Sequence, residues 1–230
     1  MKKRDLNIIV VAHPDDEILG FGGSGSILIE KGEIVQPIIL CGEVLERSNR
    51  PESMQLLHDM KKANKMLGFN TPILGSFPNL AMNTVSSIEI VKFIEKQLRK
   101  FLPKRIYTHH PNDMNKDHFF VSESTLAAAK YFQRNNLDDP IEMISFMEIL
   151  SSTEWNLSNT SNIFVPNNFV DITKNIELKI KSLDCYSGIM RDAPHPRSKE
   201  VLKALAALRG TQCGCKYAES FQVVYQRSFL

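Results

Sequence analysis

The chain has 230 residues, and its 28 lysines and arginines nearly balance 26 aspartates and glutamates, for a formal net charge of +2. This balance excludes binding of nucleic acid or of an anionic membrane surface driven by bulk charge. Hydrophobic residues make up 43% of the chain, which excludes a disordered or low-complexity protein.

The predicted elements alternate between continuous apolar runs and segments of helical period, the pattern of a parallel sheet covered on both faces. Strands are predicted at residues 6–12, 35–41, 72–74, 105–109 and 143–150, and a last strand at 221–227. Helices are predicted at 52–67, from the capping box Ser86-x-x-Glu89 to Phe101, and at 118–131, 173–186 and 198–208. Residues 151–168 are predicted to form a polar loop. Because no repeat or linker interrupts the chain, we expect one α/β domain over residues 1–230.

The first apolar run is too short for a signal sequence or a membrane span, so no membrane insertion is expected. The four cysteines are too few and too irregularly spaced for a disulfide scaffold, which favours a reducing, cytoplasmic location.

Directly after the first predicted strand, the segment His13-Pro14-Asp15-Asp16-Glu17 gathers a histidine and three acidic side chains. Ligands of open α/β sheets bind at this end of the strands, and histidine with carboxylate suits Zn²⁺ or another divalent transition metal. His13 and Asp16, three residues apart on a turn, can face one side. Asp15 would then take a proton from a metal-bound water. Taken alone, the spacing favours a solvated acidic turn that caps a helix.

A second polar segment, residues 107–118, also follows a predicted strand and opens a helix. His118 would complete a set of three protein ligands and leave a position for water, as in catalytic zinc sites. Asp117 would orient His118 or a neighbouring group, or would act as the N-cap of the helix.

Together, Ala12-His13-Pro14-Asp15-Asp16-Glu17 and Pro111-Asn112-Asp113-x-Asn115-x-Asp117-His118 resemble the LmbE/PIG-L family of zinc-dependent N-acetyl-sugar deacetylases. Weaker likenesses at residues 42–43, 151–155, 194–198 and 217–221 resemble members of bacterial saccharide biosynthesis. The resemblance implies a single deacetylase domain over residues 1–230 with a Rossmann-like three-layer sandwich and a mostly parallel sheet. It also implies zinc on His13, Asp16 and His118, with Asp15 as the general base.

The sequence departs from the family at Asn115. The family usually has a histidine at this position, and that histidine, paired with the residue at Asp117, helps to hold the oxyanion and donates a proton. Asn115 can donate a hydrogen bond but cannot act as an acid. Either Asp15 performs both proton transfers, or His109 or His110 substitutes, or catalysis is weak. We favour Asp15, because zinc lowers the pKa of its bound water to about 7 and leaves the base little to do.

Two other functions compete with deacetylation. Gly20-x-Gly22-x-x-Gly25 matches the fingerprint of NAD-binding Rossmann proteins. The match begins well beyond the predicted strand and beside acidic residues that would repel a pyrophosphate. The glycines are therefore expected to let a helix pack close to the sheet. The other alternative is a non-catalytic relative that binds zinc or a sugar.

The expected reaction is hydrolytic removal of the acetyl group from an N-acetylated amino sugar that is nucleotide-linked, lipid-linked or a free glycoside. The candidate substrate-binding residues are Arg47, Arg50, Arg197 and His110, since the forked donors of arginine suit a phosphate or carboxylate. The expected partner is a small-molecule amino sugar. No nucleic acid is expected, and a homo-oligomer is compatible with the sequence.

Overall fold

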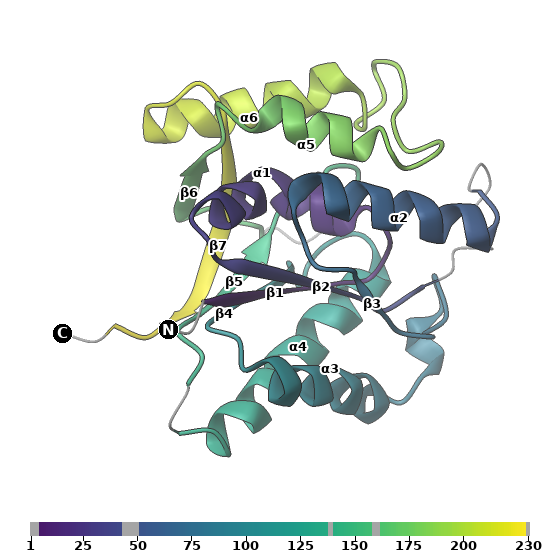
Figure 1. Ribbon diagram of the computed structural model, residues 1–230, viewed down its shortest axis with the longest axis vertical. Coiled ribbons are helices and arrows are strands. Elements are labelled where there is room, and N and C mark those ends of the chain that lie inside the picture. Colours follow the sequence, from purple (N-terminus) through teal and green to yellow (C-terminus); the bar gives the residue numbers. More distant parts are fainter. Residues whose placement is uncertain (1–4, 43–50, 138–139, 158–161, 229–230) are drawn as a thin grey trace.

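The computed structural model describes residues 5–42, 51–137, 140–157 and 162–228. Its centre is a seven-stranded sheet of order β3-β2-β1-β4-β5-β7-β6 (Figure 1). The parallel strands are β1 (Leu6–Val11), β2 (Ile34–Ile39), β3 (Ile73–Leu74), β4 (Arg105–His109) and β5 (Met143–Met147). At one edge, β7 (Ala218–Gln226) pairs antiparallel with β5 and with β6 (Asn168–Asp171).

Helices cover both faces of the sheet (Figure 1). One face carries α3 (Ser87–Phe101) and α4 (Lys116–Arg134), and the other carries α1 (Asp16–Glu30) and α2 (Ser53–Leu67). Beyond them, α5 (Ile176–Leu183) packs on α1 and α2, and α6 (Lys199–Cys213) packs on β7. Short 3₁₀ helices span Met82–Thr84 and Thr153–Trp155. The predicted α/β architecture with a mostly parallel sheet is confirmed.

Strand β1 is buried on both faces, which explains its continuous apolar sequence. Ile9 and Val11 belong to the core shared with α1 and α2. Ile8 and Val10 belong to the core shared with α3 and α4. Side chains alternate across a strand, so a strand covered by helices on both sides needs an apolar residue at every position.

Several predicted element boundaries are wrong. No strand is predicted where residues 168–171 form β6, which begins at the last residue of the predicted polar loop, and β7 begins at Ala218, before the predicted start at 221. Ser86 precedes α3 without a side-chain hydrogen bond to it, so the predicted capping box does not form. The side chains of β6 are exposed or only partly buried, which explains why no apolar run marks this strand in the sequence.

The glycine-rich segment lies inside α1 rather than in a phosphate-binding loop. A Cβ atom at Gly20 would lie 2.7 Å from Cδ1 of Ile149, and one at Gly25 would lie 2.3 Å from Cζ of Phe69. Both distances are too short for real contacts, so the glycines allow α1 to approach its neighbours closely. This position removes the structural basis for a dinucleotide fingerprint and supports the close-packing interpretation.

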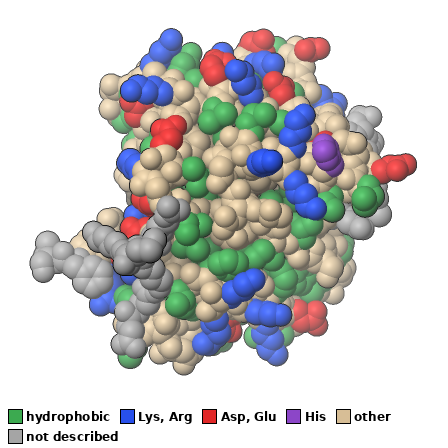
Figure 2. Space-filling view, viewed as in Figure 1, with side chains coloured by type: hydrophobic (Ala, Val, Ile, Leu, Met, Phe, Trp, Pro, Cys, Tyr) green, Lys and Arg blue, Asp and Glu red, His purple; other side chains and the backbone are tan. Residues whose placement is uncertain are grey.

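On the face shown in Figure 2, basic and acidic side chains are interspersed, without a large patch of one sign. In the part of the chain that the structure describes, no helix combines the length and the apolar composition needed to cross a bilayer.

A buried ion pair joins α5 to β7 beside α1. Nζ of Lys179 lies 2.7 Å from Oε1 of Glu219, and the two side chains are 9% and 6% exposed. The carboxylate also accepts the backbone N–H groups of Gly23 and Ser24, and Lys179 donates to the carbonyl oxygen of Leu19. The pair therefore satisfies main-chain groups of α1 and ties the C-terminal strand to that helix.

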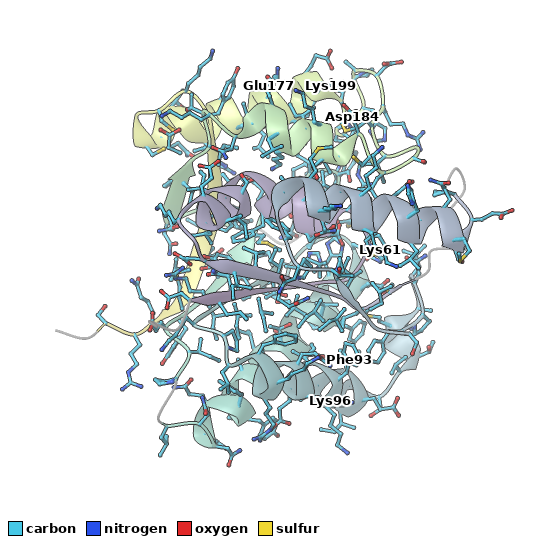
Figure 3. The ribbon with its side chains drawn as sticks, viewed as in Figure 1. Lys61, Phe93, Lys96, Glu177, Asp184 and Lys199 are labelled. Atoms are coloured by element: carbon cyan, nitrogen blue, oxygen red, sulfur yellow. The ribbon has the colours of Figure 1, made fainter. Side chains whose placement is uncertain are left out.

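Replacing Lys179 with Met is expected to lower the free energy of unfolding by about 3–5 kcal/mol, because Glu219 loses its buried cation. The matched control is Lys199→Met in the exposed pair of Lys199 with Asp184, labelled on the outer helices in Figure 3. Loss of this exposed pair is expected to cost at most about 1 kcal/mol. Urea unfolding followed by circular dichroism measures both variants, and equal costs would contradict the expectation.

Candidate metal centre and active site

The strand order reverses between β1 and β4, and the helices that follow these neighbouring strands, α1 and α4, lie on opposite faces of the sheet (Figure 1). At such a reversal the C-terminal ends of the strands border a crevice, where ligands of open α/β sheets bind. Residues 13–17 follow β1 and residues 110–118 follow β4. The topology therefore brings the two polar segments of the sequence to the same edge of the sheet.

Three buried side chains converge in this crevice. Oδ2 of Asp16 lies 3.2 Å from Nδ1 of His13 and 3.2 Å from Nε2 of His118. The two nitrogen atoms lie 3.3 Å apart. In a tetrahedral zinc site with bonds of about 2.0 Å, neighbouring ligand atoms are about 3.3 Å apart. These three atoms, here called the ligand triangle, therefore have the spacing and the donor types that suit Zn²⁺.

Each histidine of the ligand triangle has a carboxylate at its other ring nitrogen. Nε2 of His13 lies 3.0 Å from Oδ2 of Asp117, and Nδ1 of His118 lies 3.0 Å from Oδ2 of Asp113. Carboxylates in this position orient ligating histidines and raise their basicity. Asp117 therefore orients His13, which lies beside His118 in the ligand triangle. The other predicted role of Asp117, as the N-cap of the helix, is wrong. The N-cap of α4 is Asn115, whose Oδ1 accepts the backbone N–H of Asp117 at 3.0 Å.

The two supporting carboxylates are themselves held by distant segments. Asp117 accepts the backbone N–H of Leu80 at 2.6 Å. Asp113 accepts hydrogen bonds from the hydroxyl groups of Ser152 and, at 2.9 Å, of Thr153. The sequence alone assigns no role to Asp113, because its hydroxyl partners lie 39 and 40 residues further along the chain. The local signal is only that Asp113 belongs to the same polar segment as His118.

Mutual charge compensation accounts for the burial of these groups. Burial alone would raise the pKa of Asp16, but His118 and His13 hold it well below its usual value. Burial also opposes a charge on His118, yet Asp113 and Asp16 raise its pKa to about 10. The carboxylates around the ligand triangle therefore favour a positive charge there, which suits a cation.

The other two histidines of the second segment are not arranged as acids. Nε2 of His109 accepts the backbone N–H of Ala12 at 2.8 Å, and burial lowers the pKa of His109 to about 3. His110 lies edge-on to the rings of Phe146 and Phe164, and burial lowers its pKa as well. A histidine that stays neutral at pH 7 is a poor general acid.

Asp15 is fully buried at the N-terminus of α1, beside Asp16. Its Oδ2 accepts a hydrogen bond from Nη1 of Arg197 at 3.0 Å. Of the four predicted substrate-binding residues, the structure thus places Arg197 against the predicted base. Arg47 and Arg50 lie outside the described residues.

A cleft of about 520 Å³ is lined by the start of α2 and by residues 74–79. Gly42 and Asn79 line the cleft. The residue before Gly42, Cys41, has its Sγ within 4.8 Å of ligand atoms of His13 and Asp117. The cleft therefore borders the segment that carries Cys41, and the ligand-triangle residues are not among those that line it.

The fold and the buried cluster define an α/β protein with a His/Asp metal-binding group at the crevice of its sheet. Residues 8–129 match the PIG-L family, described as GlcNAc-PI de-N-acetylase. The match spans more than half of the chain, and the protein belongs to this family of deacetylases. It is also 24% identical over 151 residues to "Uncharacterized deacetylase YaiS" of Escherichia coli strain K12, over 63% of this chain and 80% of that protein.

Solved structures with the same fold include N,N'-diacetylchitobiose deacetylase from Pyrococcus horikoshii, with a TM-score of 0.79, 19% identity and coverage of 97% of this chain and 85% of that one. The conserved protein TT1542 from Thermus thermophilus has a TM-score of 0.79 and 21% identity, with 99% and 98% coverage. GalB, the 4-carboxy-2-hydroxymuconate hydratase from Pseudomonas putida KT2440, has a TM-score of 0.77 and 18% identity, with 98% coverage of both. At such identities the likeness shows the fold alone, so the reaction has to be argued from the site.

The Asp113→Asn variant is expected to bind Zn²⁺ about 10–100-fold more weakly, because an amide cannot supply the charge that orients His118. Met114→Ala, in the same loop and 64% exposed in the wild type, is the control and should bind as the wild type does. Competition against a chromogenic chelator measures the affinity, and circular dichroism checks the fold. Equal affinities for folded Asp113→Asn and wild type would contradict the role of Asp113.

Proposed function

We propose that this protein is a metal-dependent N-deacetylase that hydrolyses the acetyl group of an N-acetylated amino sugar. The observation that carries the proposal is the position of Asp15, next in sequence to Asp16 of the ligand triangle and buried at the same crevice. Membership of the PIG-L family and the fold shared with a chitobiose deacetylase support an acetamide substrate. A free, nucleotide-linked or lipid-linked sugar is compatible with this chemistry.

His13, Asp16 and His118 would hold the metal ion, for which we propose Zn²⁺ and which another divalent transition metal could replace. Three protein ligands leave a fourth position, as in catalytic zinc sites. When bound, the ion would lower the pKa of a coordinated water to about 7 and polarise the acetyl carbonyl group. Asp117 and Asp113 hold the two histidine rings in the orientation that this requires.

Asp15 is the proposed general base and general acid. It accepts a proton from the attacking water as the water oxygen bonds to the acetyl carbon. The side-chain amide of Asn115 donates a hydrogen bond to the carbonyl oxygen as negative charge develops on it. Asp15 then returns the proton to the amide nitrogen as the carbon–nitrogen bond breaks. Acetic acid and a free amine leave, and a proton passes from the acid to the amine to give acetate and an ammonium group.

The assignment of both proton transfers to Asp15 is supported by the chemistry of its competitors. Asn115 has no acidic proton. His109 and His110 are kept neutral by burial, and the acceptor nitrogen of His109 is occupied by the backbone N–H of Ala12. The other carboxylates around the triangle contact histidine rings, whereas that of Asp15 accepts a hydrogen bond from a guanidinium group.

The Asp15→Asn variant is expected to lose at least about 100-fold in kcat and to keep its metal, since positioned acid–base groups contribute about 10²–10⁴-fold. Acetate release is measured with a panel that includes N,N'-diacetylchitobiose, free N-acetylglucosamine and a nucleotide-linked N-acetylglucosamine. The control is Asp192→Asn, at an exposed aspartate. Full activity of Asp15→Asn would contradict the mechanism.

Two results, one from this panel and one from ligand-binding and metal analysis of the wild type, would favour the alternatives. A wild-type protein that binds Zn²⁺ and releases no acetate from any sugar would be a non-catalytic relative. Binding of NAD without a bound divalent ion would favour a dinucleotide-binding protein.

The Asn115→Ser variant separates oxyanion stabilisation from helix capping, because serine is a good N-cap residue but carries no amide donor. Its kcat is expected to fall about 100-fold, the typical cost of removing one oxyanion donor. Asn115→Ala should show the same fall and, in addition, lose about 1 kcal/mol of unfolding free energy with the cap. Wild-type kcat in Asn115→Ser would leave capping as the function of Asn115.

A further inference from the structure

The backbone of Asp15 adopts a conformation that its surroundings must enforce. Its φ is 101°, a left-handed value that costs a non-glycine residue about 1–3 kcal/mol. The backbone N–H of Asp15 donates to Oε2 of Glu17 at 3.0 Å. The other carboxylate oxygen of Glu17 accepts hydrogen bonds from Nδ2 of Asn64 and from the hydroxyl of Tyr186. Three segments of the chain thus hold the main chain of Asp15 in this conformation.

The side chain of Asp15 is held from the far end of the chain. Nη1 of Arg197 donates to its Oδ2 at 3.0 Å, and the aspartate side chain is 0% exposed while the arginine is 15% exposed. A buried carboxylate needs charge compensation and hydrogen-bond donors. The planar guanidinium presents its donors in fixed directions, so it sets the orientation of the carboxylate as well as its charge balance.

Arg197 is in turn held in place by its own neighbours. Its Nε donates to Oγ of Ser151, which has a positive φ of 76° and follows β5. Its backbone N–H donates to Nδ1 of His195 at 3.0 Å. The next residue, Ser198, is the N-cap of α6 and accepts the backbone N–H of Val201. The guanidinium therefore bridges the start of α1 and the loop after β5 from a turn anchored on α6.

We infer that Arg197 is a positioning residue that holds the carboxylate of Asp15 in the orientation needed for proton transfer at the ligand triangle. The inference rests on the proposed function and replaces the substrate-binding role expected for Arg197. Arg197 acts through Asp15 rather than on the sugar. Misplacement of a reacting group by about 1 Å can cost about 100-fold in rate, which is the effect expected from loss of this contact.

The test compares Arg197→Ala and Arg197→Lys with Arg191→Ala, an exposed arginine of the same turn. With N,N'-diacetylchitobiose, or the best sugar of the panel, Arg197→Ala should lose about 100-fold in kcat, with KM within about 2-fold of wild type. Arg197→Lys, which keeps the charge, should lose less. Guanidinium at non-denaturing concentration should restore part of the activity of Arg197→Ala, and urea should not. Arg191→Ala should behave as wild type.

Two further readouts do not depend on activity. The Zn²⁺ content of Arg197→Ala should equal that of the wild type. Amide hydrogen exchange in residues 13–17 should be faster in Arg197→Ala and unchanged in Arg191→Ala, because the contact that orders the start of α1 is lost.

Each contrary outcome would overturn the positioning role. A rise in KM at unchanged kcat would assign Arg197 to substrate binding, and wild-type kinetics in Arg197→Ala would leave it without a role. Loss of the fold or of the metal in both Arg197 variants would make its role structural. If the wild type releases no acetate from any sugar, the proposed function fails. Unchanged amide hydrogen exchange in residues 13–17 of Arg197→Ala would then reject the positioning role independently of activity.

Discussion

Ionisable groups can be buried only when each one is compensated, and this constraint underlies the whole site. Around the ligand triangle the crevice buries imidazoles and carboxylates together, among them those of His13, His109, His118, Asp16, Asp113 and Asp117. The carboxylates accept hydrogen bonds from histidine nitrogens, hydroxyls or backbone N–H groups. Their negative charge raises the pKa of His118 and favours a cation between His13, Asp16 and His118. The same compensation therefore explains both how the cluster stays folded and why a metal ion would bind there.

The fold supplies this cluster from two strand–helix connections that are distant in the sequence. The β1–α1 and β4–α4 connections, side by side in the sheet, bring the ligand triangle together. The match to the family ends at residue 129, yet Tyr186 and Arg197, which support Asp15, come from beyond it. The ion pair of Lys179 with Glu219 ties this later part to α1. Residues outside the matched segment thus contribute to the environment of the proposed base.

The sequence predicts the ligand triangle because its signals are local. His13 and Asp16 are three residues apart, and His118 follows a second strand whose end must meet the first at the same edge of a parallel sheet. The pairing of Asp113 with His118 depends on which ring nitrogen faces which carboxylate, and a sequence pattern does not contain that information. The contact of Arg197 with Asp15 joins residues 182 positions apart and is equally hidden.

The errors in the predicted fold have a similar origin. Residues 168–171 are partly exposed and carry no apolar run, so pairing with β7 rather than their own composition makes them a strand. The glycines of α1 match a nucleotide-binding pattern, but their need for small side chains comes from Ile149 and Phe69, which only the folded chain brings near.

The most direct test of the account is anomalous diffraction at the zinc absorption edge from crystals of the Zn²⁺-loaded protein. A strong peak is expected about 2.0–2.2 Å from Nδ1 of His13, Oδ2 of Asp16 and Nε2 of His118. A zinc ion bound by other residues, or no peak between these three atoms in zinc-loaded crystals, would contradict it.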